Sequence, residues 1–309
     1  MVSTCISANQ KAKVSSLPKI AVLLAAYNGE KYLEAQLDTI LAQQGVDIEV
    51  FASLDISDDS SWAILNNYAT QDSRVQLLSY GKKYGSAAQN FFRIIKEVSL
   101  QNFNFVALSD QDDIWLPGKL CEAVKTLTEG DFDAYSGNAT AFWEDGRRKL
   151  INKAQPLKEW DYLFEAAGPG CSYVIKQQLA IDLQKKLLLK SSQLEKVALH
   201  DWFIYAFSRS RNYRWVIDSR SFIEYRQHGL NVVGANVGLS SIFRRIKLLR
   251  SGWYKEQIKL LVHILEIKSP IAFYFVKGQR FKCLKEIKNM RRNPKDQAAL
   301  AIMVILKIY

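Results

Sequence analysis

The chain has 309 residues, of which 48% are hydrophobic and 24% are charged. This composition suits one or two domains with a sizeable apolar core, and it excludes disordered, collagen-like and low-complexity proteins for most of the length. The formal net charge of +11 is unevenly distributed. Residues 1–230 hold 26 Lys and Arg against 27 Asp and Glu, whereas residues 231–309 hold 16 against 4.

The four cysteines lie far apart and form no CxxC pair, which argues against a disulfide framework or a structural zinc site. Residues 1–18 are mostly polar, so we expect a flexible N-terminal tail rather than a secretory signal. No uninterrupted apolar run reaches 18 residues, so we expect no transmembrane helix. A cytoplasmic protein is the expectation, peripheral at the inner face of the plasma membrane.

Short apolar runs alternate with amphipathic stretches in the first part of the chain. Strands are predicted at residues 20–26, 48–54, 75–78 and 103–108, and helices at 33–41, 60–68 and 86–98. Asn28 follows the first run and can cap the helix after it. Strands that alternate with helices indicate parallel strands joined by crossovers, so residues 19 to about 125 form a doubly wound α/β half. Residues 126–235 are more irregular, and 239–309 are mainly helical.

Polar side chains follow three of the predicted strands. Tyr27 and Asn28 follow the first, Asp55 follows the second, and Asp110 to Asp113 follow the fourth. Ligands of such sheets bind outside the carboxyl ends of the strands, so these residues share one crevice. The sequence contains no GxGxxG after the first strand and no GxxxxGK[ST], which disfavours a nicotinamide dehydrogenase and a P-loop NTPase.

The segment Ser109-Asp110-Gln111-Asp112-Asp113 is the most informative one. Three carboxylates within four residues repel one another unless a cation lies among them. Oxygen ligands suit Mg²⁺ or Mn²⁺, which commonly bridge carboxylates to substrate phosphates. The alternative is a solvated acidic turn that caps the next helix.

Other polar residues have both a functional and a structural interpretation. Asp55 could accept hydrogen bonds from a base or sugar, or it could form an Asx-turn. Small residues from Gly85 onward permit close approach of a phosphate at a helix start, which alone is a weak signal. Asp201 is a candidate general base, and His228 a candidate metal or phosphate ligand. A lone histidine is more often structural, which is how we interpret His263.

Taken in order, these segments resemble the family-2 glycosyltransferases, specifically the rhamnosyltransferase-like branch of bacterial polysaccharide biosynthesis. The matching residues span about 19–235 and comprise Ala25–Leu33 with Gln36-Leu37, Ser53–Asp58, Gly85 with Asn90-Phe91, Ser109–Trp115 with Lys119-Leu120, His200–Trp202 and Tyr225–Ala235. One departure stands out: Leu54 and Ile56 occupy positions where many relatives carry Asp and Gly.

The resemblance implies a GT-A fold, a Rossmann-like mixed sheet flanked by helices, and a metal-dependent, inverting transfer from a nucleotide-sugar. It implies Asp201 as the catalytic base, and Asp112 with His228 as ligands of Mg²⁺ or Mn²⁺. Donor-nucleotide contacts would come from Ala26, Tyr27, Asn28, Glu30, Asp55, Gly85, Asn90, Asp110 and Gln111. The acceptor pocket would be lined by Asp113, Trp115, Gly170, Cys171 and Trp202.

The chemistry is consistent with these residue types. Departure of a nucleoside diphosphate develops negative charge that a carboxylate-bound cation stabilises. The acceptor hydroxyl needs a second carboxylate to take its proton. The transition state resembles the oxocarbenium ion of glycoside hydrolysis.

The segment from Ser241 onward, SIFRRIKLLRSGWYKEQIKLLVHIL, predicts a basic amphipathic helix, and we assign 236–309 as a basic amphipathic helical region after a catalytic domain at 19–235. Such a helix can lie on an anionic membrane. The alternative, weighed nearly equally, is that these helices pack on the catalytic domain and expose a basic face.

Three hypotheses follow. The first is a glycosyltransferase that moves L-rhamnose from dTDP-L-rhamnose to a lipid-linked, growing cell-surface polysaccharide such as O-antigen or capsule. The second is a metal-dependent phosphohydrolase or nucleotidyltransferase that uses the same carboxylates. The third is a nucleic-acid binding module that acts through the basic tail, although the tail has no known recognition motif. Under the first, no nucleic acid is a partner.

Overall fold

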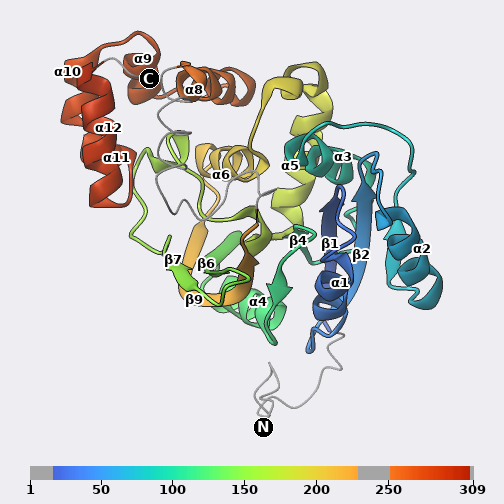
Figure 1. The fold of residues 1–309 in the computed structure, drawn as a ribbon. Coiled ribbons are helices and arrows are strands. Elements are labelled where there is room, and N and C mark those ends of the chain that lie inside the picture. The colour runs from blue at the N-terminus through green and yellow to red at the C-terminus, as the bar shows by residue number, and fades with distance from the viewer. Residues whose placement is uncertain (1–16, 229–250, 307–309) are drawn as a thin grey trace.

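The computed structural model describes residues 17–228 and 251–306. A mixed β-sheet runs through the molecule with helices on both faces (Figure 1). The strands are β1 (Lys19–Ala26), β2 (Asp47–Leu54), β3 (Val75–Leu77), β4 (Phe105–Ser109), β5 (Ile114–Trp115), β6 (Ala134–Phe142), β7 (Arg148–Ile151), β8 (Val174–Lys176) and β9 (Trp215–Arg226). Their order in the sheet is β3-β2-β1-β4-β8-β6-β9-β5, and β7 pairs with β6.

The helices of the catalytic part are α1 (Leu33–Leu41), α2 (Ser61–Gln71), α3 (Ala87–Glu97), α4 (Lys119–Glu129), α5 (Gln177–Leu189) and α6 (His200–Ser210). Short 3₁₀ turns are η1 (Asp161–Leu163), η2 (Gly170–Ser172) and η3 (Ser191–Lys196). After residue 250 follow α8 (Trp253–Leu265), α9 (Pro270–Val276), α10 (Arg280–Lys285), α11 (Ile287–Met290) and α12 (Pro294–Leu306).

The first half of the sheet is parallel, as the sequence predicts. Strand β1 pairs in parallel with β2 and β4, and β2 pairs in parallel with β3. Alternate residues of β1 supply two cores: Ala21 and Leu23 pack with α3, whereas Val22 and Leu24 pack with α1 and α4. Because both faces of β1 are covered, its sequence is a continuous apolar run rather than an alternating one. The predicted doubly wound half is confirmed.

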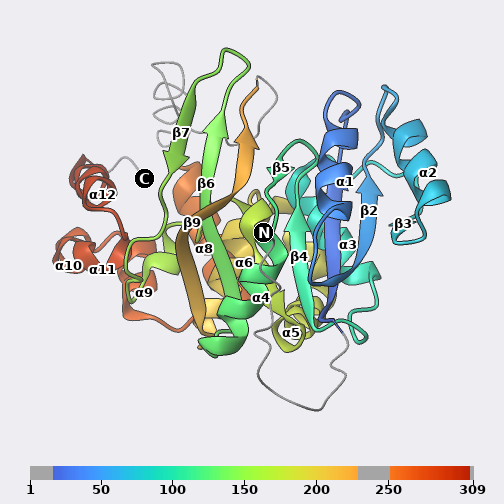
Figure 2. The same cartoon turned by 90° about the horizontal axis from the view of Figure 1, so that it is seen from below.

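The second half of the sheet is mixed in direction, and its β6–β9 pairing has register shifts between Gly137 and Asn138 and between Asn138 and Thr140. The described part of the section expected to be irregular, 126–228, therefore combines ordered strands and helices with an irregular pairing. Strand β8 runs antiparallel to β4 and to β6, whereas β9 runs parallel to β6 and antiparallel to β5. Figure 2 shows β6, β7 and β9 side by side. Strand β6 has the sequence AYSGNATAF, and its first six residues are all buried although several are small or polar. The burial of β6 results from tertiary packing. It could not be predicted from the sequence of β6, which contains no apolar run.

The C-terminal helices extend one end of the molecule, opposite α2, in Figures 1 and 2. Helix α8 buries Ile258 and Leu261 in the core that also contains α3 and α6. This part of the predicted basic amphipathic helix therefore packs on the catalytic part, as the second alternative expected. Its first part, Ser241 to Arg250, and the proposed boundary at 235/236 lie outside the described residues. Among the helices that the structure describes, none combines the length and the hydropathy needed to cross a bilayer.

Candidate active site

The carboxyl ends of β1 and β4 are joined by the side chain of Gln111. Its Oε1 accepts a hydrogen bond from the backbone N–H of Tyr27 at 2.7 Å, and its Nε2 donates to the Tyr27 carbonyl at 2.8 Å. A Cβ at Gly29 would lie 2.4 Å from the Gln111 Oε1, so only glycine leaves room for this amide. The amide thus holds the half-exposed Tyr27 at the mouth of the crevice.

Asp55 follows β2 and is almost wholly engaged by the backbone of the loop before α3. Its Oδ1 accepts from the N–H groups of Ile56 and Tyr84, and its Oδ2 accepts from the Gly85 N–H at 2.7 Å. The structure therefore brings the predicted pair Asp55 and Gly85 together, with the carboxylate ordering the loop. A nucleotide contact by Asp55 stays a prediction.

Two further residues of the predicted donor set act as braces. Asn90 is 2% exposed, and its Nδ2 donates to the carbonyls of Ala26 and Ser53 at the ends of β1 and β2. The Asn90 amide therefore joins the ends of two strands, and a contact of Asn90 with the donor stays a prediction. Glu30 accepts from the Ser60 N–H at 2.9 Å and is exposed.

The predicted cap at Asn28 is also wrong. The residue at the start of α1 is Tyr32, without a side-chain cap, and Asn28 has a left-handed φ of 44°. Its Oδ1 instead accepts from the Asp58 N–H at 3.1 Å. The side chain thereby fixes the loop that follows β2, one of the walls of the crevice.

The acidic turn after β4 meets the end of β9. Strand β5 pairs antiparallel with β9, with Ile114 opposite Glu224. That register brings the residues that follow Tyr225 alongside the acidic turn. The His228 Nε2 lies 2.7 Å from the Asp112 Oδ2, and the Arg226 Nε donates to the Asp112 carbonyl at 2.9 Å. The structure thus brings together the two predicted metal ligands, which are 116 positions apart.

The other two carboxyl groups of the turn are held in a buried environment. Burial raises the pKa of Asp110 to about 7, with added contributions from the charges of Asp112 and Asp201. Burial, with added contributions from the charges of Asp112 and Asp110, raises the pKa of Asp113 well above its ordinary value. The backbone N–H of Arg226 donates to the Asp113 Oδ1 at 3.2 Å.

The donor set at Asp112 and His228 fits a divalent cation. Both side chains are only slightly exposed, 12% and 14%, and they present a carboxylate oxygen and an imidazole nitrogen to one point. Such ligands suit Mn²⁺ and, through the carboxylate, Mg²⁺. A second group, Asp110, Asp113 and Cys171, also has ligand atoms within 4.8 Å of one another. Burial raises the pKa of the Cys171 thiol well above its ordinary value, which keeps it protonated and makes it a poor ligand for these ions.

Asp201 lies at the start of α6, on the side of the crevice that faces Asp110. Its Oδ1 accepts from the Trp202 N–H at 2.7 Å. Burial raises the pKa of Asp201 to about 6, and the charge of Lys153 opposes that rise. A carboxylate with this pKa is ionised at neutral pH and is more basic than an ordinary one, which suits a general base.

His200, the neighbour of Asp201, is structural. Its ring stacks on Phe91 with centroids 4.0 Å apart, and burial lowers the pKa of His200 to about 3. It is therefore neutral at any physiological pH. A Cβ at Gly170 would lie 2.5 Å from the His200 Nε2 and 3.3 Å from the Asp201 Cβ, so η2 packs directly against the start of α6.

The five residues predicted to line the acceptor pocket are all buried: Asp113, Trp115, Gly170, Cys171 and Trp202. The Trp202 Nε1 donates to the Tyr162 carbonyl, and its ring stacks on Tyr254 of α8. The buried Lys119 Nζ lies 3.4 Å from the centroid of the Trp115 ring. Both tryptophan rings therefore pack against protein groups, and contact of these residues with an acceptor stays a prediction.

Three residues of the site escaped the sequence analysis. Arg226 stands over the Tyr32 ring at 4.4 Å, and that ring lies 5.1 Å from the His228 ring, so both orient the predicted ligands. Arg226 was part of a visible cluster, and only the pairing of β5 with β9 reveals its role. The charge of Lys153 lowers the pKa of Asp201. Lys153 belongs to no motif, so nothing in the sequence pointed to this interaction.

Comparisons with known proteins decide the family. Residues 21–171 match the model of glycosyl transferase family 2. The chain is also 37% identical over 289 residues to the dTDP-rhamnosyl transferase RfbG of Shigella flexneri, which covers 93% of this chain and 100% of that protein. The chain belongs to glycosyl transferase family 2. The transferase is also 28% identical over 163 residues to the putative glycosyltransferase EpsH of Bacillus subtilis, covering 50% of this chain and 46% of that one.

Solved structures support the fold of the transferase. The TarS 1-349 fragment of S. aureus in complex with UDP-GlcNAc superposes with a TM-score of 0.59 at 14% identity, covering 94% of this chain and 82% of that chain. The same fragment in complex with UDP gives a TM-score of 0.54. At such identity the likeness concerns the fold alone, and it confirms the predicted GT-A architecture. Family membership also decides among the three hypotheses: the protein is a glycosyltransferase.

Proposed function

We propose that the transferase moves L-rhamnose from dTDP-L-rhamnose to a growing, lipid-linked cell-surface polysaccharide, in an inverting reaction that depends on Mg²⁺ or Mn²⁺. The donor assignment is supported by the 37% identity to the dTDP-rhamnosyl transferase of Shigella flexneri over nearly the whole chain. The reaction type is supported by one observation above all. Two acidic sites with different surroundings, Asp112 beside His228 and the separate Asp201, both lie close enough to Asp110 for their charges to raise its pKa.

The residues divide the chemistry between them. Asp112 and His228 would hold the cation, which when bound supplies a Lewis acid for the charge that develops on the departing diphosphate. Asp201 takes the proton of the acceptor hydroxyl as that oxygen attacks the anomeric carbon. A single base opposite the leaving group means one displacement, and one displacement inverts the anomeric configuration.

The surroundings of each group suit its task. Asp112 is kept at the crevice by the Arg226 side chain on its carbonyl and by the imidazole of His228. Asp201 is enclosed, so its carboxylate is poorly hydrated and a stronger base. Gln111 and Asp55 order the two loops between which the nucleotide would lie.

A donor panel tests this function. The protein is mixed with Mn²⁺ and each of several nucleotide-sugars, and its melting temperature is measured. We expect dTDP-L-rhamnose to give the largest rise, and transfer to an acceptor extract to be lost in Asp112→Ala and in excess EDTA. Full transfer in EDTA, or a larger rise with another nucleotide-sugar, would contradict the metal or the donor assignment respectively.

A lipid-linked acceptor would lie at a membrane surface. We therefore propose that the C-terminal helices dock on an anionic membrane. Residues 251–306 contain 11 Lys and Arg against 4 Asp and Glu. In the described part of the chain, Lys268, Lys277, Lys285 and Lys288 take part in no ion pair shorter than 4.0 Å. Large apolar side chains are exposed on the same helices, namely Phe273, Phe281, Ile302, Ile305 and Leu306.

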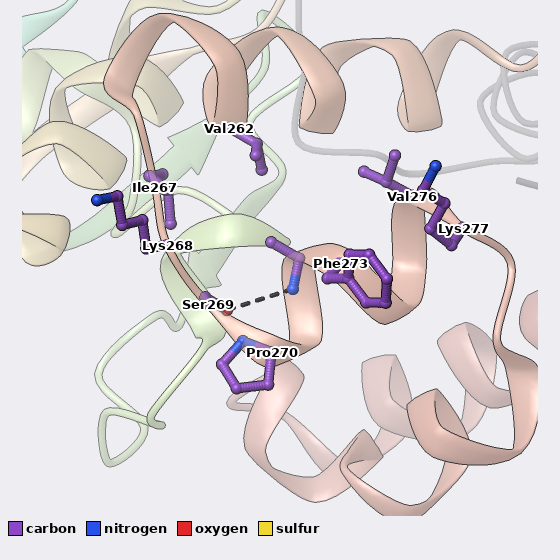
Figure 3. Close-up of a pocket in the computed structure, with 9 residues that line it drawn as sticks. Val262, Ile267, Lys268, Ser269, Pro270, Phe273, Val276 and Lys277 are labelled. Atoms are coloured by element: carbon purple, nitrogen blue, oxygen red, sulfur yellow. Dashed lines mark hydrogen bonds between the residues drawn. The ribbon is translucent and has the colours of Figure 1, made fainter.

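These side chains form connected surfaces rather than isolated ones. Arg280 donates to the Ile305 carbonyl, which brings Phe281, 82% exposed, next to the end of α12. Between α8 and α9 lies a hollow of about 460 Å³, lined by Val262, Ile267, Phe273 and Val276 and flanked by two lysines (Figure 3). Apolar rings among unpaired lysines suit the interface of a bilayer with negatively charged head groups.

Flotation with lipid vesicles tests the docking proposal. The wild type should bind vesicles that contain phosphatidylglycerol and not vesicles of phosphatidylcholine alone. The double variant Phe273→Ser/Phe281→Ser should lose most of this binding, whereas Leu150→Ser, which alters an exposed leucine on β7, should retain it. Equal binding of both variants would contradict docking through α9 and α10.

A further inference from the structure

Two consecutive arginines near the end of the chain are buried against the catalytic part. Arg291 and Arg292 lie between α11 and α12, and the side chain of Arg292 is 0% exposed. Arg292 is therefore among the least accessible charged groups of the described residues, in a segment otherwise rich in exposed lysine. Full burial of a guanidinium is unfavourable unless its charge is paired and its donors are bonded. Among the described residues both terminal NH groups of Arg292 have partners, and its Nε has none.

Most partners of Arg292 lie in the short segment from η1 to Ala166, and its NH1 group also lies 3.4 Å from the Tyr205 hydroxyl of α6. Its NH1 group donates to the Asp161 Oδ2 at 3.1 Å, and its NH2 group donates to the Ala166 carbonyl at 2.6 Å and pairs with the Glu165 Oε2 at 3.3 Å. Its backbone N–H donates to the Glu165 Oε1 at 2.6 Å. Arg291 adds a bond to the Phe164 carbonyl.

Helix α6 holds the same segment from the other side. The Asp161 Oδ1 accepts from the Tyr205 hydroxyl at 2.9 Å and from the Arg209 NH1 at 3.2 Å. The 0% exposed Asp161 carboxylate thus joins α6 to the loop before α12. A carboxylate shared by two guanidiniums fixes direction as well as distance, since each N–H···O bond is charge-assisted.

The clamped segment leads directly to the proposed base. Five residues after Ala166 the chain reaches Cys171 in η2, and a Cβ at the neighbouring Gly170 would lie 3.3 Å from the Asp201 Cβ, so the two backbones pack closely. The Tyr173 hydroxyl accepts from the Ala167 N–H and lies within hydrogen-bond distance of the Gly168 and Asp201 carbonyls. Segment 161–173 therefore touches Arg292 at one end and Asp201 at the other.

We propose that Arg292 is a positioning residue for the transfer reaction, which acts through segment 161–173 to hold Asp201 at its place in the crevice. The proposal rests on the proposed role of Asp201 as the base. The proposal makes the C-terminal helices part of the catalytic unit. Arg292, which holds segment 161–173 behind Asp201, comes from the loop between α11 and α12. A well-packed apolar group at position 292 could serve stability alone, so the geometry of the ion network is what Arg292 contributes.

The test uses the conservative variant Arg292→Lys, which keeps the charge but cannot reach Asp161, Glu165 and Ala166 at once. Leu300→Ala is the matched control, since Leu300 is 1% exposed on α12 and its aliphatic side chain cannot take part in the ion network of Arg292. Two readouts are taken from each full-length variant: kcat with the donor KM, and hydrogen–deuterium exchange of segment 161–173.

We expect Arg292→Lys to lower kcat at least tenfold with a donor KM within about twofold of wild type, since a displacement of about 1 Å of a reacting group has that effect. Exchange in 161–173 should accelerate in Arg292→Lys and not in Leu300→Ala, and Leu300→Ala should keep the wild-type kcat while folded. Wild-type kcat in Arg292→Lys, or a lowered kcat without faster exchange in that segment, would overturn the proposal.

The failure of the proposed base is recognised separately. If Asp201→Asn keeps the wild-type kcat, Asp201 is not the base, whatever Arg292→Lys does. Exchange in 161–173 depends on no catalytic assignment, so it reports on the clamp in either case. An unchanged exchange pattern in Arg292→Lys overturns the clamp even when the transferase activity is confirmed.

Discussion

The pKa of Asp201 is set mainly by burial, which raises it, and is lowered slightly by the charge of Lys153. Asp110, Lys153 and Tyr173 are the titratable groups that interact with it, and burial raises its pKa to about 6. His200 contributes no titration near neutrality because burial lowers its pKa to about 3. The carboxyl must be deprotonated to act as a base, so activity should rise with pH across this value.

We expect kcat at saturating Mn²⁺ to increase as the pH is raised through about 6, and Asp201→Asn to lower kcat by about a thousandfold at neutral pH. Saturating cation matters because its charge lowers the pKa of Asp110 and removes that group from the profile. Donor affinity should be unchanged in Asp201→Asn. A kcat that stays constant from about pH 5 to pH 7.5, with the protein folded throughout, would contradict the assignment.

Gly29 is required by a neighbouring side chain rather than by its own backbone conformation. Gly29→Ala should displace the Gln111 amide and lose both hydrogen bonds to Tyr27, at about 1 kcal/mol of unfolding free energy each. Urea denaturation measures the change. If the clash is the cause, Gly29→Ala/Gln111→Ala should be no less stable than Gln111→Ala alone. Additive losses would show that Gly29 acts by another route.

For individual residues, the sequence predicted which charged side chains meet at the site, but it did not predict which side chains pack against the tryptophans. Asp112 and His228 could be assigned to one site because their types and their places in the motif order were visible. The surroundings of Trp115 and Trp202 could not be predicted, because a tryptophan in the sequence does not reveal which groups its ring faces. Only the contacts with Lys119 and Tyr254 decide that question.

Among the secondary-structure elements, η2 packs directly against the start of α6, where His200 and Asp201 lie. Gly170→Ala would place a methyl group 2.5 Å from the His200 Nε2, and we expect the shifted α6 to lower kcat about tenfold. Removing the imidazole should relieve the contact, so Gly170→Ala/His200→Ala should recover part of the lost kcat. Transfer kinetics of the two variants measure this. A double variant slower than both single variants would contradict a steric origin.

Elements with strong apolar periodicity were predictable, and those shaped by their neighbours were not. Strand β1 is covered on both faces and contains the apolar run IAVLLAA, so its burial could be predicted from its own sequence. Strand β6 contains Ser136, Gly137 and Asn138, which are buried because β8 and β9 pair with it and the Asn138 side chain bonds the Ser219 carbonyl. Such burial becomes visible only after the sheet is assembled.

At the scale of the whole molecule, residues 251–306 lie at the end opposite α2 and combine an excess of positive charge with five large exposed apolar side chains, Phe273, Phe281, Ile302, Ile305 and Leu306. If lysines contribute to docking, binding to phosphatidylglycerol vesicles should weaken when salt is raised from about 0.1 M to about 1 M, because the screening length falls from about 10 Å to about 3 Å. Vesicle flotation at each salt concentration measures it. Binding that is indifferent to salt would leave no role for the lysines.

The GT-A fold and the crevice at the carboxyl ends of β1, β2 and β4 followed from the order of strands, helices and polar residues. The union of the C-terminal helices with the site did not, because it depends on Arg292 meeting Asp161 across 131 positions. Charge counting described that region as a basic appendage, and it could not distinguish a buried arginine from an exposed lysine.

The central claim is that Asp112 and His228 hold a divalent cation through which the donor diphosphate binds. Calorimetric titration of dTDP into the wild type, with Mn²⁺ and then with EDTA, measures this most directly. We predict at least tenfold weaker binding in EDTA, and loss of the Mn²⁺ dependence in Asp112→Asn but not in Asp58→Asn, an exposed carboxylate on the neighbouring loop. Equal affinity for dTDP with and without Mn²⁺, or an unaltered Mn²⁺ dependence in Asp112→Asn, would contradict the account.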